Sequence, residues 1–552
     1  MINEKVKKEG ADSRKMRGGY YTPQSIANFI CQWAIRDVTE QVLEPSCGDG
    51  NFIEAAVERF KELGLADTEL LGRIQGVELL NDEAEKSKQR VAKYGLNSTT
   101  IVNDDFFSYA SSLGDQKFDV VVGNPPFIRY QNFPEQHRTL AFSMMVEMGL
   151  NPNKLTNIWV PFLVLSAGLL KATGRLAMVI PAELFQVKYA AETRIFLSSF
   201  FERITIVTFK KLVFKEIQQE IVLLLCEKSV TSHPGIRVVE LESLDGLDTL
   251  KVASIQKKDV KRLEHDKEKW TKYFLETSEI KLMRRLRSDH RIRLAGELMI
   301  TNVGLVTGLN DFFMINEQLA EKWGIKSYTK KVVSKSSHFK GIGFTQVDFQ
   351  DNSDSNFDGL LFLPPDVDFD LLPEECQAYI AYGESKGYHL GYKCRIRKRW
   401  YITPSIYSPD AFALRQVSDY PKLIVNHTDA SSTDTIHRVR FLPGVSSELV
   451  TISYLNSLTF AFSEITGRSY GGGVLTFEPT EIGELPLPLL SDSTVNFTEI
   501  DTLIRQRRIE EVLDIVDRQL LINQLGFDEN EVNQLRVIWR KLSGRRLNRN
   551  KS

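Results

Sequence analysis

The chain of 552 residues is longer than one hydrophobic core usually organises, so two or three domains are expected. Hydrophobic residues make up 42% and charged residues 26%, which is typical of a soluble globular protein. The five cysteines form no CxxC pair, which argues against a disulfide framework and a zinc site. The start resembles no signal peptide, and no apolar stretch is long enough to cross a bilayer. A cytoplasmic protein that uses neither membrane nor metal is therefore expected.

The formal net charge of −2 carries little information, because a nucleic-acid enzyme can concentrate its positive charge on one face. One short segment is strongly basic and contains Lys393, Arg395, Arg397, Lys398 and Arg399. A basic run is most often a solvated surface, so charge alone does not indicate DNA.

Residues 24–230 alternate amphipathic helical patterns with short apolar runs. Helices are expected at residues 25–35, 52–63 and 163–170, and strands at 41–43, 74–79, 100–102, 118–122, 176–180, 204–209 and 221–226. This alternation predicts an α/β fold, with a mainly parallel seven-stranded sheet and helices on both faces. Ligands of such sheets bind beyond the carboxyl ends of the strands.

After about residue 235 the strands become irregular, and Gly, Pro, Ser and Asp are frequent until about residue 495. From residue 500 the pattern is helical again, and the tail after Ser543 is expected to be frayed. We therefore expect a first domain at 1–240, a mixed α+β domain at 241–494, and a C-terminal helical segment with a basic tail at 495–552.

A glycine loop joins the first predicted strand to a helix. It reads Leu43-Glu44-Pro45-Ser46-Cys47-Gly48-Asp49-Gly50, and its two glycines let the backbone approach a ligand or adopt positive φ. The N-terminus of the following helix offers unpaired N–H groups. The loop is neither the GxGxxG dinucleotide motif nor a Walker loop, so by itself it is equally compatible with an ordinary strand–helix turn.

Two acidic residues follow the next two strands. Glu78 ends the second strand, where a carboxylate can accept both hydroxyls of a ribose. Asp105 follows the third strand, where it can accept a hydrogen bond from an adenine amino group while Phe106 packs against the ring. Each has an ordinary alternative, namely a solvated Glu at a strand end and an Asp that caps a helix.

The fourth strand runs into Asn124-Pro125-Pro126-Phe127. The two prolines fix the backbone and remove two N–H donors, so the local carbonyls are free to accept hydrogen bonds. The Asn124 side-chain oxygen and the Pro125 carbonyl can accept both hydrogens of one amino group, and Phe127 supplies a stacking face. This arrangement suits a planar, amino-bearing base extruded from a duplex.

These motifs, in this order, resemble those of the gamma-class, TaqI-type adenine-specific DNA methyltransferases. The resemblance spans nearly the whole chain, from Gly19-Tyr20-Tyr21-Thr22-Pro23 to Thr307-Gly308-Leu309-Asn310-Asp311-Phe312-Phe313, Arg399-Trp400-Tyr401, Gly471-Gly472-Gly473 and Leu485-Pro486-Leu487-Pro488. Two departures stand out. Phe127 replaces the Tyr of many members, and residues 47–50 are closer to the general methyltransferase loop.

The resemblance implies a Rossmann-like class I methyltransferase domain that uses S-adenosyl-L-methionine. Its cofactor-binding residues would be Tyr21, Thr22, Pro23, Glu44, Pro45, Cys47, Gly48, Gly50, Glu78, Asp105, Phe106 and Asn124. In this assignment the residues up to Gly50 hold the methionine portion. Glu78 holds the ribose, and Asp105 with Phe106 holds the adenine.

The resemblance also implies methyl transfer to the N6 amino group of an adenine flipped out of double-stranded DNA. The catalytic residues would be Asn124, Pro125, Pro126 and Phe127, with Phe214 as a second aromatic that contacts the base. Electrostatics and positioning would carry the reaction without an acid–base pair. His137, near the motif, is therefore expected to be an ordinary surface residue.

The second domain would be a target-recognition domain in which the basic segment Lys393, Arg395, Arg397, Lys398 and Arg399 contacts phosphates. The implied partners are double-stranded DNA and, in a restriction–modification or related defence system, a separately encoded restriction endonuclease. A monomer is the default expectation.

Four alternatives stay open. Methylation of cytosine N4 uses a similar tetrad, although Ser is commoner in its first position. Methylation of a protein glutamine also uses Asn-Pro-Pro, but does not account for the second domain. Pro365-Asp366 and Glu384-Ser385-Lys386 formally match a PD…ExK nuclease, but they lie inside the predicted recognition domain. An inactive scaffold could lose Asn124 or the loop glycines, which are intact here.

Overall fold

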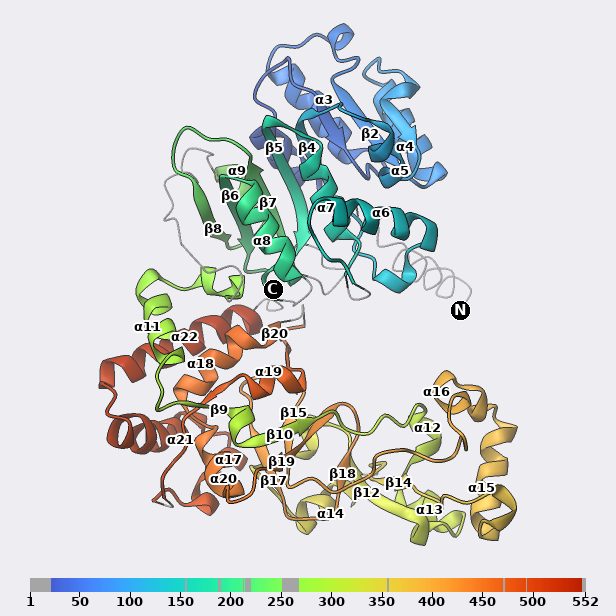
Figure 1. Cartoon of the computed structure of the whole chain (residues 1–552), viewed down its shortest axis with the longest axis vertical. Helices are drawn as coiled ribbons and strands as arrows, with labels where there is room; N and C mark the ends of the chain where they lie inside the picture. The colour runs from blue at the N-terminus through green and yellow to red at the C-terminus, as the bar shows by residue number, and fades with distance from the viewer. Residues whose placement is uncertain are drawn as a thin grey trace. The chain divides into compact units, whose positions relative to one another are not determined.

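The computed structural model describes residues 21–153, 156–186, 190–211, 213, 220–250, 268–354, 357–469, 472–492 and 494–548. The chain divides into two compact units (Figure 1). The first extends to Glu276, and the second comprises Thr277–Ser469 and Gly473–Leu547. Among the described residues, no helix combines the length and the apolar character needed to cross a membrane.

The first unit is built on one eight-stranded sheet with the order β3-β2-β1-β4-β5-β7-β6-β8. The strands are β1 Val42–Glu44, β2 Ile74–Glu78, β3 Ile101–Asn103, β4 Phe118–Gly123, β5 Leu170–Pro181, β6 Arg203–Phe209, β7 Ile221–Glu227 and β8 Gly235–Leu241. Only β7 is antiparallel to its neighbours within this described sheet. The predicted mainly parallel α/β fold is confirmed, and β8 is added to the seven expected strands.

The helices of this unit are α2 Gln24–Ala34, α3 Asn51–Glu62, α4 Asn81–Ala92, α5 Phe106–Ser112, α6 Glu135–Glu147, α7 Trp159–Gly168, α8 Ala191–Phe200 and α9 Gly246–Thr249. Their amphipathic faces explain their position. In α2, Ile26, Ile30 and Cys31 are fully buried, whereas Ser25 is exposed. Helix α2 therefore packs its apolar side against α3 and the middle of the sheet.

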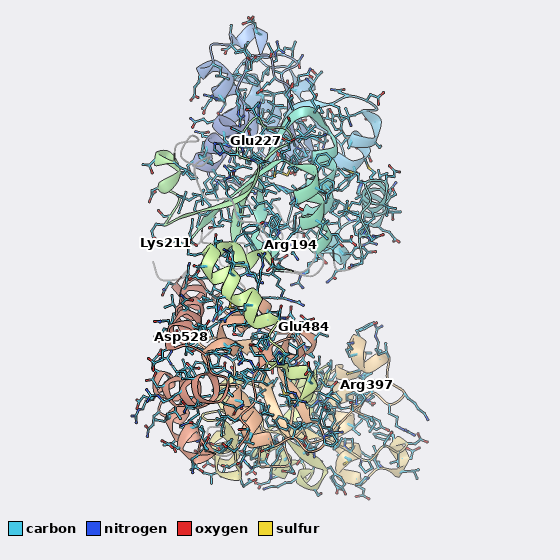
Figure 2. The ribbon with its side chains drawn as sticks, turned by 60° about the vertical axis from the view of Figure 1, so that its left-hand side comes forward. Arg194, Lys211, Glu227, Arg397, Glu484 and Asp528 are labelled. Atoms are coloured by element: carbon cyan, nitrogen blue, oxygen red, sulfur yellow. The ribbon has the colours of Figure 1, made fainter. Side chains whose placement is uncertain are left out.

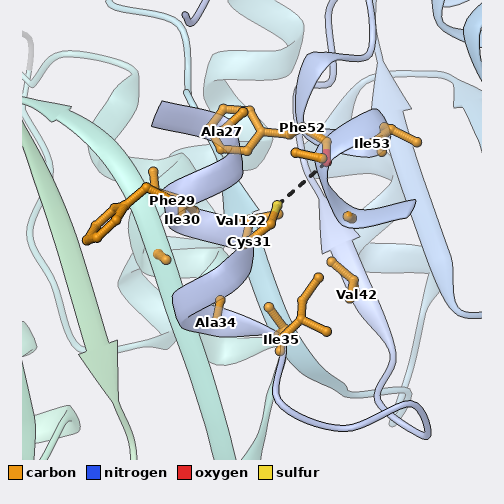
Figure 3. Packing of buried hydrophobic residues seen from close by; sticks show 14 of the residues in the cluster. Ala27, Phe29, Ile30, Cys31, Ala34, Ile35, Val42, Phe52, Ile53 and Val122 are labelled. Atoms are coloured by element: carbon orange, nitrogen blue, oxygen red, sulfur yellow. Dashed lines mark hydrogen bonds between the residues drawn. The ribbon is translucent and has the colours of Figure 1, made fainter. Parts of the chain in front are cut away.

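Both faces of the sheet are covered. Val120 and Val122 of β4 belong to one buried cluster with Ile30 and Phe52, so this face packs on α2 and α3. Figure 3 shows this packing, in which Cys31 Sγ lies 3.7 Å from the Phe52 carbonyl oxygen. Val121 is equally buried but points to the opposite face, because successive side chains of a strand alternate. Burial on both faces is typical of a mainly parallel sheet.

The described residues of the second unit form four smaller sheets, with the orders β10-β19-β15-β17-β13, β11-β14-β12-β18, β16-β21-β20 and β22-β9. Its strands are β9 Arg293–Leu294, β10 Met299–Asn302, β11 Met314–Ile315, β12 Thr329–Val333, β13 Gly343–Phe344, β14 Leu360–Phe362, β15 Ala411–Leu414, β16 Gln416–Val417, β17 Leu423–Asn426, β18 Ser431–Ser432, β19 Ile436–Phe441, β20 Arg468–Ser469, β21 Leu475–Thr476 and β22 Pro486–Leu487. The predicted mixed, loop-rich α+β character is thus present.

Twelve α-helices accompany these sheets among the described residues. They are α11 Thr277–Arg287, α12 Asn310–Phe313, α13 Glu317–Lys322, α14 Gln346–Asp354, α15 Glu374–Ser385, α16 Tyr392–Arg395, α17 Ser447–Ser453, α18 Ser457–Thr466, α19 Pro479–Gly483, α20 Phe497–Arg505, α21 Ile509–Val516 and α22 Glu529–Leu547. The last three form the expected helical C-terminal part, and α22 packs along α18.

The expectation of a frayed tail after Ser543 is wrong, because α22 continues to Leu547. Arg546 is 1% exposed, and its guanidinium donates to both carboxylate oxygens of Glu464, at 2.7 Å and 3.1 Å. It also donates to the carbonyls of Ser418 and Gly473. A buried charge with this many partners holds the last turn of the helix in place.

Replacing Arg546 by Ala is expected to lower the free energy of unfolding of the second unit by about 3–5 kcal/mol, because the Glu464 carboxylate would stay buried without its guanidinium. Urea titration followed by circular dichroism measures the change. The exposed Arg518, replaced by Ala, serves as the control and should stay within about 0.5 kcal/mol of the parent. Equal stability of the two variants would show that the tail is frayed after all.

Candidate functional site

The residues singled out in the first unit follow the ends of four adjacent parallel strands, β3, β2, β1 and β4. Pairing fixes how these ends align, since Glu44 lies opposite Gly76 and Glu78 lies opposite Asn103. Gly123 ends β4 beside them. The structure therefore brings the glycine loop, Glu78, Asp105 and Asn124 to one edge of the sheet, where α/β folds bind their ligands.

The glycine loop is a tight strand–helix turn held by backbone hydrogen bonds. The Cys47 N–H donates to the Val77 carbonyl at 2.9 Å, and the Gly50 N–H donates to the Cys47 carbonyl at 2.8 Å. Gly50 has a φ of +93° and is the N-cap residue of α3. A Cβ at Gly50 would lie 2.6 Å from Ser87 Oγ on α4, so only glycine fits this close approach.

Glu78 is tied to this loop. Its carboxylate accepts the Gly48 N–H at 2.9 Å through Oε2 and the Leu80 N–H at 2.8 Å through Oε1. Burial raises the pKa of Glu78, and the hydrogen bonds from Leu80 and Gly48 act against that shift. Each oxygen accepts one backbone N–H and keeps lone-pair capacity for a further donor, such as a hydroxyl.

Glu44 is a buried carboxylate that lacks a full set of donors. Glu44 is the last residue of β1 and is 1% exposed. Its Oε2 has no hydrogen-bond partner among the described residues. From the part of the chain that the structure describes, Oε1 accepts the Ser46 N–H alone, at 3.4 Å. Burial, followed by repulsion from the Glu78 carboxylate, raises the pKa of Glu44 well above its usual value. This orphaned oxygen is the feature that a cationic ligand group would satisfy.

Gly123 makes room for this carboxylate. A Cβ at Gly123 would lie 2.5 Å from Glu44 Oε1, which no side chain could accommodate without displacing Glu44. The strand end of β4 is thus shaped around the Glu44 side chain.

Asn124 is half-buried and is oriented by the N-terminal segment. Its side-chain Nδ2 donates to Thr22 Oγ1 at 3.1 Å, and its backbone carbonyl accepts from Ser46 Oγ at 3.3 Å. The Thr22 carbonyl in turn accepts from Asn51 Nδ2 of α3 at 3.0 Å. With the amide nitrogen on Thr22, the side-chain oxygen of Asn124 points in the other direction.

The other tetrad residues follow directly. Pro125 is buried, Pro126 and Phe127 are half-buried, and Phe127 packs against the core cluster of the first unit. Phe214, the second aromatic residue expected to contact the base, lies outside the described residues.

Asp105 and Phe106 begin α5 beyond β3. Asp105 is the N-cap residue and accepts the Ser108 N–H at 3.0 Å, so the ordinary capping role of this residue is present. Phe106 is 2% exposed and stacks on Phe162 of α7, with ring centroids 5.0 Å apart. These contacts bury Phe106 in the protein interior, where it supports the loop after β3.

At the start of the described chain, the Tyr21 ring is 52% exposed and its hydroxyl donates to Glu83 of α4 at 3.1 Å. Thr22 is buried against Asn124, and Pro23 is the N-cap residue of α2. Pro45 and Cys47 are buried within the loop. The twelve predicted cofactor residues thus all lie in or beside the loops at this sheet edge.

The basic segment of the second unit separates into two groups. Lys393, Arg395 and Lys398 are exposed. Arg399 instead binds the Asp366 and Asp368 carboxylates, each at 2.7 Å.

Arg397 (Figure 2) donates to the Val306 carbonyl at 2.9 Å and lies over the Phe313 ring, 5.5 Å from its centroid. Burial lowers the pKa of Arg397. Arg397 and Arg399 thus have partners within the second unit, and their predicted contact with phosphates stays a prediction.

Two sequence motifs of the second unit pack together around this segment. Gly308 has a φ of +83°, and a Cβ there would lie 2.5 Å from the Lys393 Cβ. Phe312 and Trp400 have ring centroids 4.7 Å apart, and the Trp400 indole N–H donates to Glu384 at 2.9 Å. Asp366 and Glu384, which belong to the nuclease-like pattern, therefore bind Arg399 and Trp400 respectively.

Sequence reasoning missed two contacts of the site. His137 Nδ1 of α6 lies 3.2 Å from Asp105 Oδ2, although His137 was expected to be an ordinary surface residue. The hydrogen bond between Thr22 and Asn124 was also not foreseen. Both join residues that are distant in sequence, so no local pattern could have indicated them.

Two family models match the chain. The model of the Eco57I restriction-modification methylase matches residues 58–214, and the model of the C-terminal domain of the type II methyltransferase M.Eco57I matches residues 267–521. Between them the matches cover parts of both structural units.

Curated relatives match over most of their length. The type II methyltransferase M.AccI of Acinetobacter calcoaceticus is 22% identical, over 94% of this chain and 97% of its own. The type II methyltransferase M.XamI of Xanthomonas campestris pv. amaranthicola is 22% identical, over 86% of each chain.

Solved structures share the fold. The type IIL restriction-modification enzyme MmeI, in complex with DNA, superposes with a TM-score of 0.55 at 12% identity, over 92% of this chain and 70% of that chain. A DrdV–DNA complex gives a TM-score of 0.51 at 14% identity, over 93% of this chain and 58% of that chain.

The sheet of the first unit has the Rossmann-like fold of class I methyltransferases. The chain belongs to the type II restriction–modification methylase family, and it is a DNA methyltransferase of the restriction–modification type.

Replacing Glu44 by Gln is expected to stabilise the ligand-free protein at pH 8 by about 1–3 kcal/mol, because it removes a buried and poorly paired charge. Since the folded-state pKa is raised, the stability that Glu44 contributes is complete below its unfolded pKa of about 4.3 and is lost as the pH rises through the folded pKa. The gain from Gln should therefore shrink as the pH falls toward 4. Urea unfolding at pH 4.5 and pH 8 measures it.

Glu78→Gln is the comparison. It should destabilise the protein, because an amide has one acceptor oxygen and would leave one of the two backbone N–H groups that Glu78 accepts without its partner. A loss of stability in Glu44→Gln at pH 8 would contradict the account of Glu44 as a poorly paired charge.

Proposed function

We propose that the enzyme transfers a methyl group from S-adenosyl-L-methionine to the N6 amino group of an adenine flipped out of double-stranded DNA at a specific sequence. The observation that carries the proposal is the placement of Asn124 at the end of β4. There it is oriented by Thr22 and stands directly after the Gly123 backbone that packs on Glu44. A site for an amino-bearing base thus adjoins a site for a cationic cofactor.

The residues fit S-adenosyl-L-methionine by their chemistry. The orphaned Glu44 oxygen suits the ammonium group of the methionine portion, and Gly48 leaves open space beside the loop. Glu78 keeps acceptor capacity for the ribose hydroxyls. Asp105 would accept a hydrogen bond from the amino group of the cofactor's adenine. Tyr21, Thr22 and Pro23 would cover the methionine portion of the cofactor. When bound, the cofactor supplies an activated methyl group on its sulfonium.

The target adenine would be held by acceptors alone. Asn124 Oδ1 and the Pro125 carbonyl would accept the two amino hydrogens, which draws the nitrogen lone pair out of conjugation with the ring. That nitrogen would form the new bond to the methyl group as the bond from the methyl group to the sulfonium sulfur breaks and the sulfur leaves as a neutral thioether. The methylated nitrogen would then lose one proton to solvent. Phe127 and Phe214 would stack on the base, worth about 1–3 kcal/mol for each stacked base, which offsets the unstacking of a flipped nucleotide.

Asn in the first tetrad position favours adenine N6 over cytosine N4 as the methylated group. The second unit favours DNA over a protein glutamine as the substrate, because glutamine methylation would not account for such a domain. The enzyme would act in the cytoplasm on double-stranded DNA as a monomer. In a restriction–modification system a separately encoded restriction endonuclease would cleave the unmodified sites. Residues 1–240 would form the catalytic domain, residues 241–494 would recognise the target, and the C-terminal helical segment at 495–552 would complete the chain.

Replacing Asn124 by Ala is expected to lower the methyl-transfer rate by about 10²–10³-fold, as for loss of one preorganised polar group at a reacting centre, while cofactor binding stays largely intact. The assay follows a labelled methyl group from S-adenosyl-L-methionine into DNA, and digestion to nucleosides identifies the modified base.

Thr22→Val removes the hydroxyl that accepts from Asn124 and should cause a smaller loss in the same direction. Loss of cofactor binding in a folded Asn124→Ala variant would show that Asn124 acts mainly on the cofactor and would contradict its role at the target base.

The exposed cations are predicted to hold phosphates. Replacing Lys393, Arg395 and Lys398 together by Gln should weaken DNA binding and reduce the slope of log K against log salt by about 0.9 for each phosphate that is no longer neutralised. Fluorescence anisotropy across a salt series measures both. The control replaces the exposed Lys281, Lys322 and Arg518 by Gln. Equal effects of the two triple variants would refute a specific role for the basic segment.

A further inference from the structure

The two oxygens of the Asp105 carboxylate have different surroundings. The side chain is only 3% exposed. Oδ2 accepts hydrogen bonds from the Ser108 N–H at 3.0 Å and from Ser108 Oγ at 3.3 Å, and His137 Nδ1 lies 3.2 Å from it, within ion-pair distance. Oδ1 makes no hydrogen bond within the described part of the chain. Oδ2 therefore contacts groups of the protein, and Oδ1 can accept a hydrogen bond from a ligand.

The three groups that face Oδ2 come from two different helices. Both Ser108 donors come from α5, the helix that Asp105 itself caps, and this local arrangement is common to many helix N-termini. His137 comes from α6, a separate helix that packs on α5. Its ring is 27% exposed and lies beside Phe133, with centroids 6.1 Å apart, and Phe133 meets Phe107 of α5 edge-on at 6.0 Å. The imidazole is thus held against Asp105 by packing.

We propose that His137 is a positioning residue of the cofactor site. By holding Asp105 Oδ2, it keeps Oδ1 as the acceptor for the exocyclic amino group of the cofactor's adenine. This inference rests on the proposed function, which assigns Asp105 to that amino group. The terminal torsion of an aspartate is broad, so a carboxylate held only from its own helix can turn and exchange its oxygens. A donor on a second helix opposes that rotation.

The test compares two ligands that differ only in the amino group. They are S-adenosylhomocysteine and its 6-deamino analogue, in which hydrogen replaces the exocyclic amino group of the adenine. His137→Phe keeps a ring against Phe133 but removes the N–H donor. By calorimetry it should bind S-adenosylhomocysteine about tenfold more weakly, in line with a weakened hydrogen bond to a charged group, while the affinity for the analogue is unchanged. His137→Asn, which restores an N–H donor, should recover most of the loss.

Gln136→Leu, an exposed position on the same helix, is the control and should leave both affinities unchanged. Thermal unfolding without ligand shows whether each variant is folded. Equal weakening of both ligands by His137→Phe would show that His137 merely supports the loop and would overturn the inference. So would unchanged binding of both. If the unsubstituted protein bound neither ligand, the proposed function would fail and this inference with it.

Discussion

Parallel pairing of β3, β2, β1 and β4 brings four strand ends to one edge, and the proposed ligand contacts at the sheet depend on that alignment. Glu44 and Glu78 are the last residues of neighbouring strands, and Asn124 follows the last residue of β4. A slip of one residue in any of these strands would turn its side chains to the opposite face. Val120 and Val122 of β4, which pack on α2 and α3, oppose such a slip. The core of the first unit and the geometry of the site are therefore set by the same contacts.

Two acidic side chains lie close together at this edge, and their negative charges repel each other. Glu44 is buried with one orphaned oxygen, and the neighbouring Glu78 carboxylate repels it further. A charge in such surroundings is stabilised only by a partner, so the site favours a ligand with a positive group. Glycines at 50 and 123 allow backbone and carboxylate to approach closely where any Cβ would interfere. Preorganised acceptors of this kind act without rearrangement when the ligand binds.

The elements that the sequence predicted best are those whose signal is local. β7 is buried at every position, and its residues 221–226 form a continuous apolar run of the kind that is typical of a strand buried on both faces. β8 was missed because it is only partly buried and lies where the pattern changes. Two contacts join residues that are far apart in the sequence, namely Arg546 with Glu464 and His137 with Asp105. No local sequence pattern indicates such contacts. For the same reason the five cations at 393–399 looked equivalent, although Arg397 and Arg399 have partners inside the second unit.

The most direct test of the central claim is expression of the protein in a bacterial host that lacks adenine methylation, followed by long-read sequencing of the native DNA. The account predicts N6-methyladenine at one short motif, absent when Asn124 is replaced by Ala. Modified cytosine at a motif would contradict the assignment of adenine as the target. The absence of any modification, from a protein that binds S-adenosyl-L-methionine, would contradict methyl transfer by this chain alone.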